Sequence, residues 1–448
     1  MSDNPHHPAH YLIVGNGAAG LSAAEVIRRR DDRGRITIIT NEPYLFYSRP
    51  GIAYFILGQV SAKQIISRTE AFYREHRLDL RQGTVTGLDL SQQIAYLDGT
   101  EPMEYDVLLL ATGSTAVPAP FPGADLDGVL TLDSLDDAKR VIAYGRRAKT
   151  AVVVGGGITA MELSEGLCHQ RARTYLLQRG DRIWPRLFDE REAALIEQAA
   201  QHEGVRLRYQ DEIEEIVGRR GKVCGVRLKS GDQLSCQVVG VAIGVRPNRQ
   251  LVAGQPVAQD KGVLVNSYMQ SSVPTLFAAG DLAQVHDRWT EQHHLDVLWP
   301  SAINEGRAAG YNMVEMAKGR PLRYEYQKGS PFNAALLYGV HLTVIGQVGN
   351  ASREQADLSY QSRGSSNVWT APFSSSYRSA WDRQGTQSLR IVMNNGRIVG
   401  ALLIGNQELA DPLRHLIETE ADLSAYESDL IHSGDQLPQR LAHLWRSY

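Results

Sequence analysis

Three spaced glycines directly after a short apolar run constrain the fold of this chain more than any other feature. Residues 11–14 suffice for one buried parallel strand. Gly15, Gly17 and Gly20 follow at the spacing G-x-G-x-x-G, and an alanine-rich helical pattern comes next. The first glycine permits a tight turn, the second lets the backbone approach a pyrophosphate, and the third lets the helix pack closely on the strand. Because the motif stands between a strand and a helix, it predicts a dinucleotide-binding unit.

An acid follows the next strand candidate of this unit. Residues 36–40 have a strand pattern, and Glu42 lies about 20 residues beyond Gly20, where an acid can bind a ribose 2′-hydroxyl. A solvated loop acid is the alternative interpretation. The spacing favours ribose binding.

A second strand–glycine–helix unit begins at residue 151. Gly155, Gly157 and Ala160 form G-x-G-x-x-A after an apolar run, and residues 174–178 are expected to be the next strand. A lone glycine motif is weak evidence, because glycine clusters also mark ordinary turns. Two such units in one chain predict two Rossmann-like dinucleotide-binding domains in an α/β fold.

Length and composition limit the class of protein. With 448 residues, the chain exceeds one domain of ~100–200 residues. The net charge of −3 gives no electrostatic footprint for nucleic acid. No apolar run approaches the ~18 residues of a transmembrane segment, and no secretory signal is visible. The three cysteines include no C-x-x-C pair, which favours a reducing cytoplasm. The histidines at positions 6, 7 and 10 are interpreted as a frayed polar terminus rather than a metal site.

The pattern changes again near residue 326. Residues 335–347, 388–393 and 397–404 are predicted to be strands, with a hairpin turn at 394–396. The predicted domains are residues 1–117 and 249–325 for one dinucleotide domain, 118–248 for the second, and 326–448 for a C-terminal α+β domain. Leu437, Leu441, Leu444 and Trp445 have helical spacing. Packing on a domain core or a dimer mate is favoured over membrane contact, because the apolar stripe is short and only weakly basic.

Four motifs together carry a family resemblance. They are residues 15–20, 105–113, 155–162 and 275–281. In this order they resemble the FAD- and NAD(P)-dependent pyridine nucleotide oxidoreductases over essentially the whole chain. Within that group the chain looks most like rubredoxin reductases, the flavin part of NADH-nitrite reductase and NADH oxidases. The resemblance implies a FAD domain interrupted by a NAD(P) domain.

The resemblance also implies site residues. Glu162, near the nicotinamide, and Tyr54, near the flavin, are the predicted catalytic residues. The positions expected to bind FAD or NAD(P)H are Gly15, Gly17, Ala18, Gly20, Glu42, Arg49, Val85, Thr112, Gly113, Gly155, Gly157, Ile158, Ala160, Glu162, Gln178, Arg179, Gly244, Gly280 and Asp281. No metal is expected. Bland alternatives are a surface acid for Asp281 and a solvated helix acid for Glu162.

Two positions near the expected flavin depart from the family pattern. Pro50 stands where the single-cysteine relatives have their redox cysteine. Because proline has no thiolate, thiol–disulfide exchange is excluded at this position. Tyr54 stands near where ferredoxin-reductase relatives have a lysine. Cys168 is expected to pack inside the NAD(P) domain, and Cys224 and Cys236 lie in strand candidates of the same domain, so turnover is expected to use no thiol.

A third departure concerns the nicotinamide cofactor. NAD enzymes carry an acid at the end of the second strand, whereas this chain has Gln178 followed by Arg179. The glutamine removes repulsion of a 2′-phosphate, and Arg179 or Arg182 could attract it. A solvated turn with surface arginines is the alternative. The sequence favours NADPH and leaves NADH open.

The expected activity is transfer of hydride from NAD(P)H to FAD and then of electrons to a small redox protein such as rubredoxin or a ferredoxin. Dioxygen or a quinone is the alternative acceptor. The other alternative is a flavin-binding subunit of a larger electron-transfer complex. A homodimer is possible.

Overall fold

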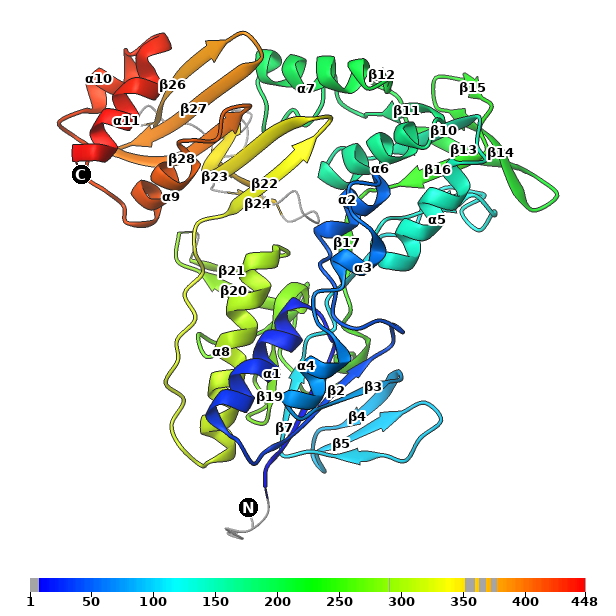
Figure 1. The fold of residues 1–448 in the computed structure, drawn as a ribbon, viewed down its shortest axis with the longest axis vertical. Coiled ribbons are helices and arrows are strands. Elements are labelled where there is room, and N and C mark those ends of the chain that lie inside the picture. The colour runs from blue at the N-terminus through cyan, green and yellow to red at the C-terminus, as the bar shows by residue number, and fades with distance from the viewer. Residues whose placement is uncertain (1–7, 290, 351–358, 362–367, 372–376, 448) are drawn as a thin grey trace. The chain divides into compact units, whose positions relative to one another are not determined.

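The structure is a computed structural model that describes residues 8–289, 291–350, 359–361, 368–371 and 377–447. The chain divides into two compact units. Unit 1 comprises residues 1–55, 60–115 and 245–328, and unit 2 comprises residues 56–59, 116–244 and 329–448. The four predicted domain segments stay predictions, because this division is coarser. Figure 1 shows the elements with their labels.

Unit 1 is built on a five-stranded parallel sheet in the order β19-β7-β1-β2-β3. The strands are β1 (His10–Val14), β2 (Arg35–Thr40), β3 (Leu78–Gln82), β7 (Val107–Leu110) and β19 (Leu276–Ala278). They are mostly apolar and buried, as expected of a parallel sheet covered on both faces. Helices α1 (Ala18–Arg30) and α8 (Trp299–Ala317) pack side by side (Figure 1), because Gly306 and Gly310 of α8 meet the α1 backbone.

Smaller elements complete unit 1. They are α2 (Gly51–Ile56), α3 (Ala62–Ile65), α4 (Glu70–Glu75), the antiparallel β4 (Val85–Asp89), β5 (Ile94–Leu97) and β6 (Met103–Glu104), β8 (Ser114–Ala116) with β17 (Val245–Pro247), β18 (Val263–Leu264), β20 (Ala283–Asp287), β21 (Gln292–Leu295), and the 3-10 turns η1 (Gln250–Val252) and η2 (Gly280–Leu282).

Unit 2 contains the second parallel sheet, in the order β12-β11-β10-β16-β9. Its elements are β9 (Val129–Leu130), α5 (Leu135–Gly145), β10 (Thr150–Val154), α6 (Ile158–His169), β11 (Arg173–Leu177), α7 (Glu190–His202), β12 (Arg206–Arg208) and β16 (Val238–Val241). A three-stranded antiparallel sheet of β13 (Ile213–Arg219), β14 (Lys222–Leu228) and β15 (Gln233–Leu234) is inserted before β16.

The C-terminal part of unit 2 is α+β. Its sheet has the order β24-β25-β23-β28-β27-β26, with β22 paired to β23. The elements are β22 (Phe332–Leu337), β23 (Val340–Asn350), β24 (Ser359–Gln361), β25 (Val368–Ala371), β26 (Tyr377–Gln384), β27 (Gln387–Asn394), β28 (Arg397–Ile404), α9 (Ala410–Glu418), α10 (Glu427–Ile431), η3 (Gly434–Gln436) and α11 (Leu437–Ser447). The predicted fold class, two Rossmann-like domains with a C-terminal α+β domain, is confirmed.

Several local predictions have clear outcomes. The hairpin turn at 394–396 is confirmed, with left-handed backbone at Asn395 and Gly396. The single strand predicted over 335–347 is wrong, because Tyr338 and Gly339 form a left-handed two-residue turn between β22 and β23. The apolar stripe of the tail packs in the C-terminal core, as predicted, with Leu437, Leu441 and Leu444 buried.

The prediction of a frayed histidine terminus is wrong for His10. This residue begins β1, is 9% exposed, and places its Nε2 3.0 Å from the Thr37 hydroxyl. Its Nδ1 lies 2.6 Å from the Glu104 carbonyl oxygen. A core strand therefore begins earlier than the polar neighbours suggested. The histidines at positions 6 and 7 lie outside the described residues.

Candidate functional site

The first glycine turn has the geometry of a phosphate cradle. Gly15 has a φ of +118°, and a Cβ there would lie 2.1 Å from the Ala111 carbonyl oxygen. A Cβ on Gly20 would lie 2.0 Å from the Gly15 carbonyl oxygen. At Gly17, by contrast, a Cβ would meet nothing within 4 Å, and no side chain caps the helix that begins at Ala18. The turn is closed against its own strands and open at uncapped N–H groups, which suits a pyrophosphate.

The second glycine turn repeats this construction in unit 2. Gly155 has a φ of +149°, and its Cβ would lie 2.1 Å from the Ala242 carbonyl oxygen. Gly157 precedes α6 without a side-chain cap, Ile158 opens the helix, and Ala160 is buried at the third motif position. Ala160 lies inside the helix rather than in left-handed backbone, so no positive φ requires a glycine at this position. The residues present therefore suit a second dinucleotide.

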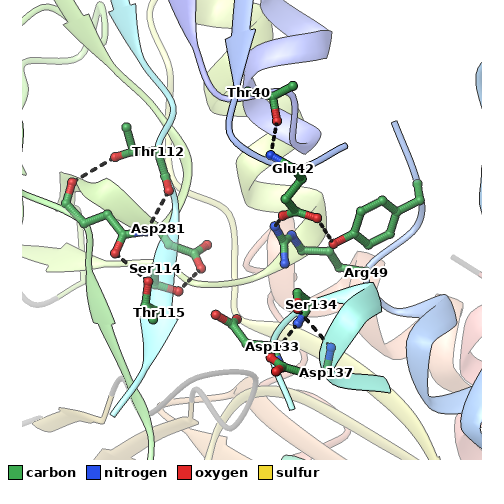
Figure 2. Close-up of polar contacts among 12 residues, drawn as sticks. Thr40, Glu42, Arg49, Thr112, Ser114, Thr115, Asp133, Ser134, Asp137 and Asp281 are labelled. Atoms are coloured by element: carbon green, nitrogen blue, oxygen red, sulfur yellow. Dashed lines mark hydrogen bonds and ion pairs between the residues drawn. The ribbon is translucent and has the colours of Figure 1, made fainter. Parts of the chain in front are cut away.

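Glu42 lies at the carboxyl end of β2, as its spacing predicts, but it is already engaged (Figure 2). Its carboxylate accepts a hydrogen bond from the Tyr47 hydroxyl at 2.6 Å. It also forms an ion pair with the Arg49 guanidinium, at 2.6 Å. The backbone N–H of Glu42 donates to the Thr40 hydroxyl at 3.2 Å. A carboxylate offers about four acceptor positions. Glu42 can therefore still accept bonds from a ribose while Tyr47 and Arg49 hold it in place.

Asp281 lies just after β19, and its carboxylate accepts a 2.6 Å hydrogen bond from the Ser114 hydroxyl (Figure 2). Burial raises the pKa of Asp281, while Ser114 and the Arg49 charge act in the opposite direction. The N–H of Gly280 donates to Glu305 of α8 at 2.7 Å, and Glu305 is fully buried. Burial holds the pKa of Glu305 well above its usual range. Glu305 thus holds the backbone of the turn that presents the Asp281 side chain.

Asn248 organises the segment around Thr112 and Gly113. Its side-chain amide donates to the Thr112 carbonyl at 2.9 Å, and the Thr112 hydroxyl donates to the Asn248 carbonyl at 2.9 Å. The N–H of Asn248 donates to the Gly113 carbonyl at 3.0 Å. A further bond joins Asn248 to Thr115 at 2.6 Å. Sequence reasoning missed Asn248, Ser114 and Glu305, since their partners lie 25 to 167 residues away along the chain.

For three other positions of unit 1 that the sequence singled out, the structure gives the place in the fold and the exposure. Val85 begins β4 and is 8% exposed. Tyr54 lies in α2 with 38% of its surface exposed, and Pro50 directly precedes that helix and is exposed. The roles predicted for Val85 and Tyr54 stay predictions.

Gln178 has an unexpected orientation. It is 4% exposed, and its side-chain amide donates to the Gly155 carbonyl at 2.8 Å. The glutamine therefore braces the second glycine turn. Arg179, the next residue, is exposed, and Arg182 forms an ion pair with Asp181 at 3.1 Å. Of the basic residues predicted at this loop, Arg179 is the one that extends from the strand end into solvent.

Glu162 lies on α6, one turn before Glu165. Burial and then the Glu165 carboxylate raise the pKa of Glu162 to about 7. Burial also raises the pKa of Glu165 to about 7, against a backbone hydrogen bond from Tyr338. The Tyr338 and Ser164 hydroxyls are 2.7 Å apart. Gly244, at the exit of this domain, has a φ of +119° and accepts a bond from the Val117 N–H.

The cysteines differ from one another. Cys236 is buried, and Cys168, expected to pack inside the domain, is half-buried. Cys224 lies in a strand, as predicted, and is exposed. Its side chain points outward from β14. Within the described residues no cluster of three or more His, Cys, Asp or Glu could hold a metal ion. Every helix among the residues that the structure describes is too short or too polar to span a membrane.

Comparison with curated proteins gives several relatives. The chain is 28% identical over 416 residues to "Nitrite reductase [NAD(P)H]" of Bacillus subtilis, covering 92% of this chain and 48% of that protein. It is 32% identical over 314 residues to "NADH oxidase" of Methanocaldococcus jannaschii, covering 68% and 69%. It is 27% identical over 274 residues to "Rubredoxin-NAD(+) reductase" of Pseudomonas putida, covering 61% and 71%. The chain thus spans about half the length of the nitrite reductase.

A solved structure shares the fold. The water-forming NADH oxidase from Lactobacillus brevis, bound to NADH, matches with a TM-score of 0.79 and 22% identity over 92% of this chain and 91% of the other. The family model described as "Pyridine nucleotide-disulphide oxidoreductase" matches residues 9–306. The predicted oxidoreductase class and the predicted cofactors FAD and NAD(P)H are confirmed at the level of this family. With two glycine cradles inside the matched region, the chain belongs to the pyridine nucleotide-disulphide oxidoreductase family.

Proposed function

We propose that this protein uses NADPH in preference to NADH to reduce bound FAD, and then delivers electrons to a small redox protein of the rubredoxin or ferredoxin kind. The observation that carries the proposal is a pair of dinucleotide cradles combined with a proline at position 50, where the thiol-dependent relatives carry cysteine. FAD, when bound, accepts hydride from the nicotinamide and can release electrons one at a time.

The residues of unit 1 supply the FAD site in this proposal. Gly17 and the first turn of α1 receive the pyrophosphate, and Glu42 receives the adenosine ribose. Asp281, held by Ser114, binds the ribityl chain or a phosphate of the flavin nucleotide. Asn248 keeps Thr112 and Gly113 in place beside that acid by its three bonds to the segment. Tyr54 stands near where ferredoxin-reductase relatives have a lysine, so the FAD site lacks that particular cation.

The residues of unit 2 supply the nicotinamide nucleotide site. Gly155, Gly157 and Ala160 shape the turn for the pyrophosphate. Gln178 places no negative charge at the strand end, because its side chain is a neutral amide, and that amide bonds the Gly155 carbonyl. The exposed Arg179 guanidinium is available to a 2′-phosphate, which supports NADPH. Glu162, with a pKa of about 7, orients the nicotinamide and changes its charge near neutral pH.

A one-electron protein acceptor is supported by two observations. Pro50 removes the thiol on which disulfide and sulfenate chemistry depends. One relative is named a rubredoxin reductase, and its matched region covers 71% of its length. We place the reaction in the cytoplasm, where the described cysteines would remain unpaired.

A second candidate is an NAD(P)H oxidase, with dioxygen or a quinone as acceptor. The observation in its favour is the 32% identity to an archaeal NADH oxidase. The third alternative, a flavin subunit reduced by a partner, is disfavoured by the intact second glycine turn.

The test has two stages. First, the protein is titrated without oxygen with NADPH and NADH. Bleaching of the flavin spectrum, at lower concentration with NADPH, is expected, whereas an unchanged spectrum with both would contradict the proposal. Second, the reduced protein is mixed in turn with rubredoxin, ferredoxin, a quinone and dioxygen. The proposal predicts fastest reoxidation by one of the two proteins. Faster reoxidation by dioxygen or quinone would favour the second candidate.

A further inference from the structure

The segment that follows Gln178 has no regular secondary structure of its own. Residues 179–189 connect β11 to α7 without a helix or strand. Near its start, the Gly180 carbonyl accepts a 3.0 Å bond from the Gln210 N–H. In its middle, the Ile183 N–H donates to the Glu197 carboxylate at 3.0 Å. The path of this segment, and hence the position of Arg179, depends on contacts with other parts of unit 2.

The end of the segment is held by the C-terminal sheet. Arg390 of β27 donates a 2.6 Å hydrogen bond to the Leu187 carbonyl oxygen. The same guanidinium forms an ion pair with Glu192 of α7 at 3.1 Å. Arg383 of the neighbouring β26 forms an ion pair with Asp189, the residue that caps α7. Two arginines about 200 residues later in the chain thus bond the end of the segment, at Leu187 and Asp189.

Burial makes this contact costly. The side chains of Arg390 and Glu192 are 1% and 0% exposed. Removing two charges from water costs several kcal/mol per ion, so such a pair adds little net stability. A second ion pair nearby, between Arg383 and Asp189, is more exposed. An arrangement that adds little stability yet fixes one particular carbonyl suggests a role in positioning that carbonyl.

We propose that Arg390 is a positioning residue for the nicotinamide nucleotide. Through the Leu187 carbonyl it fixes the segment 179–189 in the conformation that presents Arg179 to the adenosine end of the cofactor. The inference rests on the proposed function, because it assumes that this segment contacts the nucleotide. It gives the C-terminal domain a part in nucleotide affinity in addition to any contact with an electron acceptor.

The experiment uses three variants of the full-length, flavin-loaded protein. Arg390→Met removes the bond to Leu187 and leaves Glu192 as an unpaired buried charge. The double variant Glu192→Gln/Arg390→Met also removes that charge, and a glutamine oxygen can still accept the capping bond from the Asp189 N–H. Arg397→Gln is the matched control, since Arg397 lies on the adjacent strand β28 in an exposed pair with Glu420. The probes are 2′,5′-ADP and 5′-ADP, titrated by calorimetry, together with the melting temperature of each variant.

The proposal predicts that Arg390→Met lowers both the melting temperature and the affinity for the preferred probe. The double variant should regain most of the melting temperature, because no buried charge is left unpaired. Its affinity should stay about fivefold or more below the wild type, since the Leu187 carbonyl still lacks its donor. Arg397→Gln should change neither quantity.

Two results would overturn the inference. One is wild-type affinity in the double variant, which would mean that Arg390 acts on stability alone. The other is an equal loss of affinity in Arg397→Gln. If Arg390→Met does not fold, the double variant still decides. A wild type that prefers 5′-ADP contradicts the NADPH part of the proposed function and leaves the Arg390 comparison valid. A wild type that binds neither probe overturns both.

Discussion

The two glycine turns of this chain are nearly the same locally and different in their surroundings. Gly15 and Gly155 both adopt left-handed backbone directly beneath a neighbouring strand's carbonyl oxygen. At the end of the following strand, the first turn has Glu42 and the second has Gln178. Glu42 is held by its own loop, whereas Gln178 is turned back onto the glycine turn itself.

This difference separates two physical tasks. The glycine spacing shapes a surface for phosphates, and both turns share it because both domains bind a dinucleotide in this family. Discrimination between nucleotides depends on what stands at the next strand end. In unit 2 the segment that follows this strand end is also held from the C-terminal sheet, by Arg390 at Leu187 and by Arg383 at Asp189. Both glycine turns can therefore be inferred from local sequence, whereas the path of the segment after Gln178 depends on contacts across unit 2.

The largest effect should come from breaking each turn at its first glycine, where left-handed backbone and a close carbonyl oxygen coincide. Gly15→Ala places a Cβ about 2 Å from a backbone carbonyl oxygen, so the protein should lose FAD or fail to fold. Gly155→Ala meets the same obstacle in unit 2, and the yellow protein should survive but resist reduction by NADPH. Flavin content and anaerobic bleaching measure both. Gly83→Ala, whose nearest neighbour is 3.7 Å away, is the control. Equal flavin loss in both turn variants would contradict the separation of sites.

Asp281→Ala tests the acid beside the first turn. Charge-assisted hydrogen bonds contribute roughly 1.5–3 kcal/mol each, so flavin affinity should fall at least about tenfold. Ser114→Ala keeps the carboxylate and removes one 2.6 Å bond, so its effect should be smaller. Dialysis followed by measurement of retained FAD distinguishes them. Full FAD retention in Asp281→Ala would remove this residue from the site.

The strand end of the second turn is tested by Gln178→Glu. A carboxylate there would repel a 2′-phosphate, so the ratio of kcat/KM for NADPH over NADH should fall by roughly tenfold. The glutamate also loses the 2.8 Å bond to the Gly155 carbonyl, which should lower both values. Gln178→Leu loses that bond without adding charge and therefore separates the two effects. An unchanged ratio in Gln178→Glu would show that discrimination lies elsewhere.

A smaller effect is expected in the pH dependence of stability. Burial and Glu165 raise the pKa of Glu162 from 4.5 to about 7. Between these values the unfolded chain releases the proton and the folded protein keeps it, so the wild type loses stability as pH rises through this window. Glu162→Gln should lack this loss, a difference of roughly 2–6 °C in melting temperature between pH 5 and 8. Glu190→Gln, an exposed acid in the same unit, should follow the wild type. Parallel profiles for Glu162→Gln and wild type would contradict the assignment.

Local spacing made most of the parallel-sheet architecture and both glycine turns predictable. What it missed depends on distant partners or on one backbone conformation. From sequence alone the polar amide of Gln178 is expected to be exposed, whereas in the structure it bonds the Gly155 carbonyl. Ser114 and Asn248 gain their importance from contacts across more than 130 residues. Tyr338 adopts left-handed backbone that its residue type disfavours, which hid the turn between β22 and β23.

The two turns also differ in whether their unit contains a cysteine. This difference leads to the prediction that removing the thiols does not affect hydride transfer. All three cysteines belong to unit 2, whereas position 50, where thiol-dependent relatives react, is a proline of unit 1.

Removing every thiol should leave hydride transfer intact. Burial raises the pKa of Cys168, whose thiol donates to the Glu203 carbonyl, and raises that of Cys236 to about 12, so neither forms a reactive thiolate readily. Cys224 is exposed on β14 and is the one thiol that needs an explicit test. The triple variant Cys168→Ala, Cys224→Ala, Cys236→Ala, loaded with FAD, should reduce an artificial dye with NADPH within a few-fold of wild type. Cys224→Ala alone serves as the control for its exposed position. A thousandfold loss with flavin bound would correspond to about 4 kcal/mol of transition-state stabilisation. Because no structural effect of an exposed residue reaches that size, such a loss in Cys224→Ala would mean that a thiol takes part, and electron delivery without a cysteine would have to be abandoned.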